Sequence, residues 1–165
     1  MNRHLWPGLN TVEIKVSHRP TEIKNQIAIS RNILKNDAGE IHWSIAGLTK
    51  NPNMLPTLKN GPYNEKALVP KSPWIKAVPL QTPTLFITDN GSFAQTNWST
   101  KNAADVFLWV LFTQYNGVWQ TEILTLDTLS KDIPKFKDGK KLNAVAIKAI
   151  DRLGNESDYT ARKIK

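Results

Sequence analysis

A β-hairpin is encoded by residues 105–124, which read DVFLWVLFTQYNGVWQTEIL. Residues 105–115 form an apolar run rich in β-branched and aromatic side chains, which is typical of a strand buried on both faces. Asn116 and Gly117 then supply the pair of residues that a tight type I′ turn requires, and residues 118–124 return as the second strand.

Further short strands are predicted on both sides of this hairpin. They are expected over residues 84–88, 95–99, 142–150 and 159–164, with turn residues between them. No helical pattern interrupts residues 84–165. Short strands separated by regular turns are typical of a β-sandwich.

The two faces of the 105–115 strand are both apolar. The set expected to face the sandwich core consists of Trp98, Phe107, Trp109 and Leu111. The opposite set consists of Leu108, Val110 and Phe112. Because an apolar stripe should not be left in water, we expect this second set to dock against a part of the protein missing from this sequence or against a second chain.

The first half of the chain follows a different pattern. Residues 3–8 read as a strand, residues 19–34 as a helix with Pro20 in its first turn, and residues 40–47 as a second strand. A strand, helix and strand of these lengths predict a βαβ unit with parallel strands. A shorter helical segment follows at residues 53–59. Two parallel strands leave faces and edges uncovered, so this region looks like part of a larger sheet.

A connector separates the two halves. Pro70, Pro73, Pro79 and Pro83 fall within residues 70–83, which carry few charges. We therefore predict an α+β chain in two parts: a βαβ region at residues 1–70, a proline-rich connector at 71–83 and a β-sandwich at 84–165.

Composition narrows the functional classes. The 165 residues include no Cys, which excludes disulfides, thiol catalysis and Cys-ligated metals. No apolar run reaches the length of a membrane span, and residues 1–4 lack the apolar stretch of a signal peptide. The net charge is +8, and the densest lysine cluster lies at residues 131–141. Pro134 and Gly139 within it predict a solvated loop rather than a nucleic-acid surface.

The second half resembles a fibronectin type III domain. The resemblance rests on QTNWS at residues 95–99, ADVFLWVLF at 104–112 and AIKAIDRLGNES at 146–157. It implies that Trp98 is the core tryptophan of the second strand and that Trp109 replaces a tyrosine usual on the third. Asn143 stands where the family has a tyrosine, so the tyrosine corner of that family is expected to be absent.

The first half is similar to the bacterial glycoside-hydrolase-like family 10 proteins. The similar segments are RHLWPGLN at residues 3–10, EIKNQI at 22–27, IHWSI at 41–45, Asn51-Pro52, ALVP at 67–70 and Pro73-Trp74. That family is described as secreted glycosidases with a (β/α)₈ barrel followed by an immunoglobulin-like or fibronectin-like domain. The resemblance implies that residues 1–70 are the last two βα units of such a TIM-type barrel.

This resemblance also implies partners and a location. The parent protein would act on carbohydrate and be secreted, periplasmic or on the cell surface. The first six barrel strands are not in this sequence, so the partner of residues 1–70 would be the rest of the barrel or a second copy of the chain. No cofactor is implied.

Glycoside hydrolysis normally uses two carboxyl groups at the ends of barrel strands. Only Glu13 is expected on the active-site side, in the loop after the first strand, whereas Glu40 lies in the loop entering the second strand at the other end. No catalytic pair exists, so we expect no catalysis by this chain alone. His4 and His18 have no partner at metal-ligand spacing, so no metal site is expected.

The candidate substrate-binding residues are Trp6, Asn10, His42, Trp43 and Trp119. Aromatic rings offer sugars a flat apolar face, and amides bond their hydroxyl groups. Each has an alternative interpretation: Trp43 packs the barrel together with Ile41 and Ile45, Trp6 packs at the strand end, and His42 is a core group rather than one pointing into the barrel mouth.

The leading hypothesis is a non-catalytic C-terminal segment of a secreted bacterial glycoside hydrolase, with the sandwich as an accessory domain. The alternative is a free-standing carbohydrate- or protein-binding module. A complete small hydrolase is disfavoured by the lack of a carboxylate pair. The sequence does not name the sugar or its linkage.

Overall fold

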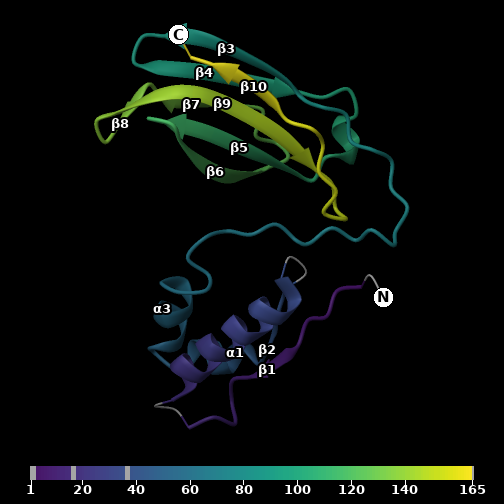
Figure 1. Cartoon of the computed structure of the whole chain (residues 1–165), viewed down its shortest axis with the longest axis vertical. Coiled ribbons are helices and arrows are strands. Elements are labelled where there is room, and N and C mark those ends of the chain that lie inside the picture. The colour runs from purple at the N-terminus through teal and green to yellow at the C-terminus, as the bar shows by residue number, and fades with distance from the viewer. Residues whose placement is uncertain (1–2, 16–17, 36–37, 165) are drawn as a thin grey trace. The chain divides into compact units, whose positions relative to one another are not determined.

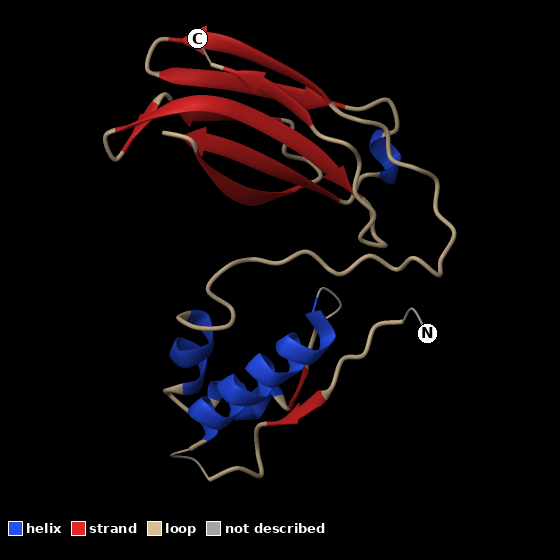
Figure 2. Cartoon of the chain, in the orientation of Figure 1, coloured by secondary structure: helices blue, strands red, loops and turns tan. Residues whose placement is uncertain are grey.

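The computed structural model describes residues 3–15, 18–35 and 38–164. The chain divides into two compact units, Met1–Ile75 and Lys76–Lys165. Helices dominate the first unit and strands the second (Figure 1, Figure 2). The coarse fold prediction is therefore confirmed: an α+β chain with a parallel βαβ pair and helices, followed by antiparallel sheets. The described residues form no closed barrel.

The N-terminal unit is built on two parallel strands. Strand β1 (Gly8–Asn10) pairs with β2 (Ile41–Trp43), and Leu9 lies opposite His42. Helix α1 (Arg19–Leu34) connects them and has the predicted bounds. Two short helices follow, α2 (Ile45–Thr49) and α3 (Met54–Lys59).

Both strands differ from their predicted bounds. The first was expected at residues 3–8, but the ladder begins after Pro7, which has no N–H to donate and only accepts a hydrogen bond from Ile41 N. The second was expected at residues 40–47 but ends at Trp43. Ser44 is the N-cap of α2 instead, and its carbonyl accepts the Gly47 N–H at 3.0 Å. A run of apolar residues this short does not distinguish a strand from a helix.

One face of the β1–β2 pair is covered and the other is bare. Leu9 packs with Ile23 and Ile27 of α1 and with Met54 and Leu58 of α3, all buried. On the opposite face, the side chain of Ile41 is 56% exposed and that of Trp43 is 69% exposed. Ile45, at the start of α2, is also exposed. The expectation that these three side chains pack inside a barrel is not met within the described residues.

The C-terminal unit contains two antiparallel sheets. Their elements are β3 (Thr84–Asn90), β4 (Phe93–Ser99), β5 (Leu108–Tyr115), β6 (Val118–Thr125), β7 (Ser130–Pro134), β8 (Phe136–Lys137), β9 (Lys140–Ile150) and β10 (Thr160–Lys163). One sheet has the order β3-β4-β7 and the other β10-β9-β5-β6, with β8 pairing to β9. A short 3₁₀ turn, Ala103–Asp105, precedes β5.

A single core lies between these two sheets. The three-stranded sheet contributes Leu85, Ala94, Trp98 and Ile133, and the other sheet contributes Trp109, Leu111, Tyr115, Leu142, Val145, Ile147 and Ala149. The rings of Trp98 and Trp109 meet edge to face with centroids 6.5 Å apart. Phe107, predicted for this core, is only half-buried and lies under the Arg152 guanidinium instead.

The predicted hairpin turn forms as expected. Asn116 and Gly117 both have positive φ, 45° and 82°, as a type I′ turn requires. The Asn116 side chain also accepts a hydrogen bond from Lys141 N at 2.9 Å. Asn143, at the position of the expected tyrosine, accepts one from Gly117 N at 3.0 Å.

The lysine-rich segment at residues 131–141 is not the predicted loop. It contains β7, β8 and the start of β9, and β7 pairs antiparallel with β4. Buried Ile133 fixes the inward face of β7, and Lys131 lies on the same face at the edge of the sheet, where its ammonium pairs with Glu122 of β6. The prediction failed because it weighed charge, Pro134 and Gly139 above the long-range pairing of β7 with β4.

The apolar stripe expected on the outer face of β5 is largely covered. Val110 is 2% exposed, and Leu108 and Phe112 are half-buried. In the ladders, Val110 lies opposite Lys148 of β9 and Ile123 of β6. The Lys148 ammonium lies 5.9 Å from the centre of the Phe112 ring, so Lys148 occupies this face beside Phe112.

Candidate functional site

The carboxyl ends of β1 and β2 bring Asn10 and Trp43 together in one register pair. The Asn10 side-chain oxygen accepts hydrogen bonds from Val12 N at 3.0 Å and Glu13 N at 3.3 Å, which turns the chain away from the strand. Trp43 lies on the bare face with its ring in solvent. Of the predicted residues at this end, Trp43 is therefore free for a ligand, whereas the Asn10 oxygen holds a turn.

Thr11 fastens the two strand ends to each other. Its hydroxyl donates to Trp43 O at 2.8 Å and lies 3.3 Å from Ser44 O, and its backbone N–H also donates to Trp43 O at 2.8 Å. The side chain is fully buried. Sequence reasoning missed Thr11, although a polar residue directly after a strand end is a recognisable signal for such a contact.

Trp6 belongs to a group of rings at the start of the chain. It stacks with His4 at a centroid distance of 5.8 Å, and His4 meets Trp74 edge to face at 4.7 Å. Arg3 lies over the Trp74 ring at 4.8 Å, and His4 Nε2 is 2.9 Å from Lys71 O. Trp6 remains partly exposed, so it packs and presents a surface at once.

His42 lies on the helix side of the parallel pair, opposite Leu9, rather than toward a barrel mouth. Its Nε2 is 2.7 Å from the Tyr63 hydroxyl, and that hydroxyl donates to Glu40 Oε2 at 3.2 Å. Arg31 Nε lies 3.7 Å from Glu40 Oε1. The four side chains form a connected polar cluster between β2, α1 and the loop after α3.

Burial sets the electrostatics of this cluster. Desolvation raises the pKa of Tyr63 to about 12, with the neighbouring Glu40 charge adding to the effect. Desolvation also lowers the pKa of His42, although Glu40 opposes that shift. Glu40 directly precedes β2, as expected, but its side chain is only 5% exposed because it contacts Tyr63 and Arg31. Glu40 and His42 share one face of an extended segment, and that spacing could have revealed the pair.

Trp119 lies on the outer face of the four-stranded sheet, 47% exposed. It borders a groove of about 400 Å³, whose other lining residues are Phe112, Thr121, Ala146, Lys148 and Tyr159. These residues come from β5, β6, β9 and the segment before β10. Sequence reasoning identified Trp119 but not its neighbours, because they are distant in sequence.

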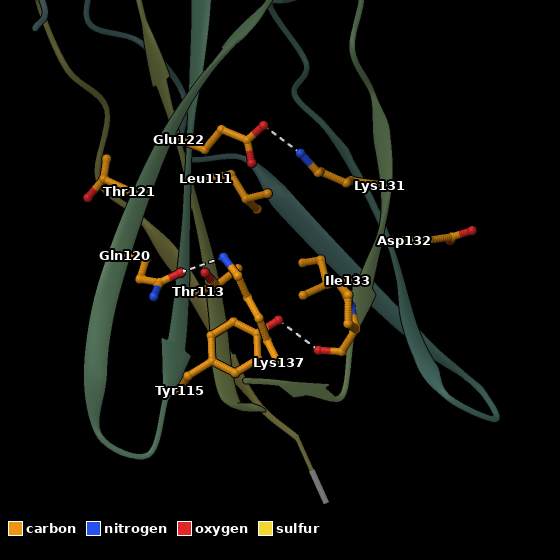
Figure 3. Close-up of a pocket in the computed structure, with 11 residues that line it drawn as sticks. Leu111, Thr113, Tyr115, Gln120, Thr121, Glu122, Lys131, Asp132, Ile133 and Lys137 are labelled. Atoms are coloured by element: carbon orange, nitrogen blue, oxygen red, sulfur yellow. Dashed lines mark hydrogen bonds and ion pairs between the residues drawn. The ribbon is translucent and has the colours of Figure 1, made fainter. Parts of the chain in front are cut away.

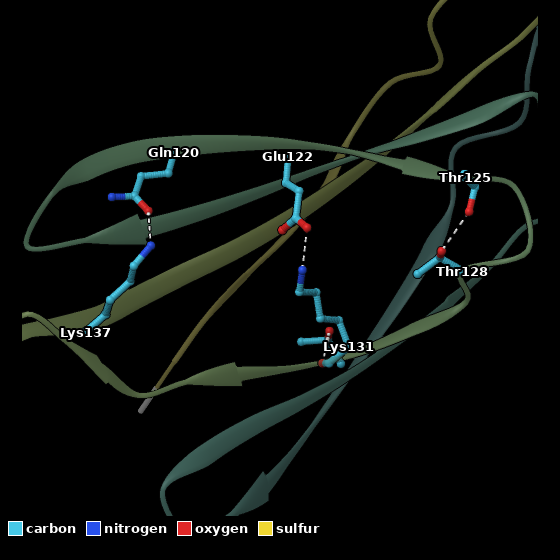
Figure 4. Close-up of polar contacts among 7 residues, drawn as sticks. Gln120, Glu122, Thr125, Thr128, Lys131 and Lys137 are labelled. Atoms are coloured by element: carbon cyan, nitrogen blue, oxygen red, sulfur yellow. Dashed lines mark hydrogen bonds and ion pairs between the residues drawn. The ribbon is translucent and has the colours of Figure 1, made fainter. Parts of the chain in front are cut away.

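A second cavity, of about 390 Å³, opens between the two sheets at the edges of β6 and β7 (Figure 3). Its floor is formed by core residues Leu111, Tyr115 and Ile133. Polar pairs bridge its rim: Lys131 to Glu122 at 2.5 Å and Lys137 to Gln120 at 3.3 Å (Figure 4). These inward-facing polar residues on edge strands are typical of protection against strand pairing with other molecules.

Comparison with known proteins finds only distant structural similarity. No family model matches the chain, and no curated protein matches it. Pectate lyase PelI from Erwinia chrysanthemi, solved with tetragalacturonic acid, is 14% identical with a TM-score of 0.39, over 49% of this chain and 28% of that chain. The Clostridium perfringens spore cortex lytic enzyme SleM is 14% identical with a TM-score of 0.42, over 98% of this chain and 68% of that chain. No family is assigned.

The described residues offer limited chemistry. Among residues 3–15, 18–35 and 38–164, no three His, Cys, Asp or Glu side chains are placed to hold a metal ion. No helix in that part of the chain is long and apolar enough to cross a membrane. Glu13 is exposed after β1, and Glu40 is held by Tyr63 and Arg31. Trp6, Trp43 and Trp119 are exposed aromatic side chains that a ligand can contact.

Proposed function

We propose that this chain is a non-catalytic C-terminal segment of a secreted bacterial glycoside hydrolase. Residues 1–70 are the last two βα units of a (β/α)₈ barrel, and residues 84–165 are an accessory fibronectin type III-like domain. The observation that carries the proposal is the bare apolar face of the β1–β2 pair, on which Ile41 and Trp43 are mostly exposed while Leu9 is buried under the helices.

This arrangement is the one expected of a single βαβ unit within an α/β barrel. Strand residues alternate between the helix layer and the barrel interior, and the interior is filled by side chains from several strands. Leu9 and His42 face the helices, whereas Asn10, Ile41 and Trp43 face the other way. Two strands alone leave that interior face in water, so further strands are its natural cover.

The sandwich supports the second half of the proposal. Its strand order, β3-β4-β7 facing β10-β9-β5-β6, places the third, fourth and last strands of the sandwich in one sheet. Two antiparallel sheets packed around one core are the layered architecture of a β-sandwich. Trp98 is buried against Trp109, as the fibronectin type III resemblance implies for its core tryptophan.

Glycosidic cleavage by this chain alone is not part of the proposal. Hydrolysis normally needs two carboxyl groups flanking the bond. Glu13 stands alone at the strand ends, and Glu40 lies on the helix side. Purified chain is expected to show no turnover of aryl glycosides, and turnover abolished by Glu13→Gln would refute this expectation.

The bare face gives a direct test. Wild-type chain should self-associate with increasing concentration in light scattering after size-exclusion chromatography, and the double variant I41S/W43S should remain monomeric. The matched control is I29S/I33S, which changes two exposed apolar residues of α1. Sequencing the DNA upstream of Met1 should reveal a continuing reading frame that encodes more βα units. A stop codon directly upstream together with a monomeric wild-type chain would overturn the proposal.

The alternative function is a free-standing carbohydrate- or protein-binding module. The groove beside Trp119 favours it, because the sandwich presents this surface whatever residues 1–70 do. Saturable binding of a glycan by a chain that stays monomeric, with no upstream reading frame, would favour this alternative.

A further inference from the structure

We propose that the groove on the outer face of the β10-β9-β5-β6 sheet is a polysaccharide-binding site, with Trp119 and Tyr159 as its aromatic platforms and Lys148 as its polar anchor. The proposal rests on the proposed function for the class of ligand and extends it to a site in the sandwich. The groove is defined by the six residues Phe112, Trp119, Thr121, Ala146, Lys148 and Tyr159.

The shape of the groove follows from the sizes of its side chains. Ala146 on the central strand β9 forms a low floor, and Ala161 of β10 lies opposite it in the ladder. Large rings stand on either side: Trp119 on β6, and Tyr159 just before β10, which is 64% exposed. β6 and β10 are three strand spacings apart, roughly 14 Å, and Tyr159 lies four residues before Lys163, which is in register with Trp119 through Gln114 and Ala144. The two rings are therefore offset along the strands, and the groove runs diagonally across the sheet, where it can hold a short stretch of an extended polymer.

The chemistry of the lining suits sugar rings. Trp and Tyr side chains combine a flat apolar face with a polar tip, which matches a pyranose ring that has apolar C–H faces and hydroxyls at its rim. Lys148 Nζ donates to Glu156 Oε2 at 2.6 Å, which leaves further N–H donors for ligand oxygens. The Thr121 hydroxyl also lines the groove.

A sugar polymer fits this surface better than a protein partner. The apolar residues that would form the centre of a protein interface are covered, because Val110 is 2% exposed beneath Lys148 and beside Ile123. Exposed apolar surface is therefore concentrated in the two rings. The groove, at about 400 Å³, falls in the range of small-molecule sites, whereas a stable protein interface covers about 800 Å² on each partner.

The test uses the full chain and measures binding of oligosaccharides by isothermal titration calorimetry. The probes are a neutral cello-oligosaccharide, a neutral xylo-oligosaccharide and an acidic oligogalacturonate, which share the pyranose ring and differ in charge. Trp119→Ala and Tyr159→Ala should each weaken binding about tenfold or more, as expected for the loss of one stacking ring and its buried area. Lys148→Gln should weaken the acidic probe more than the neutral ones.

The control variant is Phe86→Ala, which removes an equally exposed ring from the outer face of the other sheet. Near-ultraviolet circular dichroism checks that each variant retains its packed core. Binding by wild type that is unchanged in Trp119→Ala and Tyr159→Ala, or weakened equally by Phe86→Ala, would overturn the proposal, as would no saturable binding of any probe. Ring-dependent binding by a monomeric chain whose gene has a stop codon directly upstream would leave the groove supported and the barrel assignment refuted.

Discussion

Replacing Gly47 with Ala should destabilise the N-terminal unit, because the new methyl group has no room. An ideal Cβ at position 47 would lie 2.0 Å from the Thr11 hydroxyl oxygen and 2.7 Å from Thr11 Cβ. Rotation about χ1 moves the hydroxyl but leaves Cβ in place, so the second clash persists in every Thr11 rotamer. Relief requires a backbone shift at the point where Thr11 joins β1 to β2.

Two effects of opposite sign set the magnitude. Gly47 lies inside helix α2, where Ala is intrinsically better by about 1 kcal/mol. Overpacking a filled site typically costs about 1–3 kcal/mol. The shift also strains the hydrogen bond from the Thr11 hydroxyl, worth about 1 kcal/mol. We expect a net loss of roughly 1–3 kcal/mol in the free energy of unfolding of this unit.

Hydrogen exchange with mass spectrometry gives the free energy for each unit separately, since peptides from residues 9–14 and 41–49 report on the first unit alone. Gly8→Ala is the matched control, because a Cβ at Gly8 meets nothing within 4 Å, and its effect should stay within about 0.5 kcal/mol. The double variant T11G/G47A removes both clashing atoms and should be more stable than the sum of the single changes predicts. A Gly47→Ala variant as stable as Gly8→Ala would refute the reasoning.

Four further predictions concern other parts of the fold. Glu40→Gln removes the charge that raises the pKa of His42, so that pKa should fall further below 6.5 in an NMR titration. An unchanged pKa would contradict the electrostatic effect of Glu40 on His42. Burial lowers the pKa of His42 in the folded chain, so the unfolded chain binds a proton at higher pH than the folded chain does. The free energy of unfolding of the N-terminal unit, measured by urea titration, should therefore decrease as pH falls below about 6.5. A free energy of unfolding independent of pH in that range would contradict the lowered pKa of His42. Trp98→Ala should cost about 3–5 kcal/mol in urea unfolding of the sandwich, and a loss below 1 kcal/mol would place Trp98 outside the core. Asn116→Ala should cost about 1–2 kcal/mol, since it removes the bond to Lys141 N and a residue suited to positive φ, while Asn64→Ala serves as an exposed control.

The elements that were predicted correctly are those determined by residues close together in the sequence. The turn at Asn116 and Gly117 and the helix Arg19–Leu34 depend on a few neighbouring residues, and both form as expected. Strand β7 did not follow from local signals, because only its pairing with β4 and the burial of Ile133 make it a strand. The domain bounds at residues 1–70, 71–83 and 84–165 stay a prediction.

Side-chain environment was harder to predict than element type. Trp119 was identified because an exposed aromatic beside a turn is visible in the sequence, but Tyr159 and Lys148 join it only through the sheet order. Tyr63 reaches His42 and Glu40 from a loop 21 residues further along the chain than His42, a separation that no periodicity reports. Long-range contacts of this kind require the tertiary structure.

The outer apolar strand face is covered in the sandwich and exposed in the N-terminal unit, and this difference in exposure bears on function. In the sandwich, the outer face of β5 has a strand on each side, so Lys148 and Ile123 can cover Val110 from both directions. Among the described residues of the N-terminal unit, β1 and β2 pair only with each other, so Trp43 has a strand neighbour on one side only, which places the short Asn10 side chain opposite it. A change at Trp43 should therefore alter assembly, whereas a change at Trp119 should alter ligand binding without affecting assembly. Because the two surfaces lie in separate units, these effects should combine additively in the Trp43→Ser, Trp119→Ala double variant.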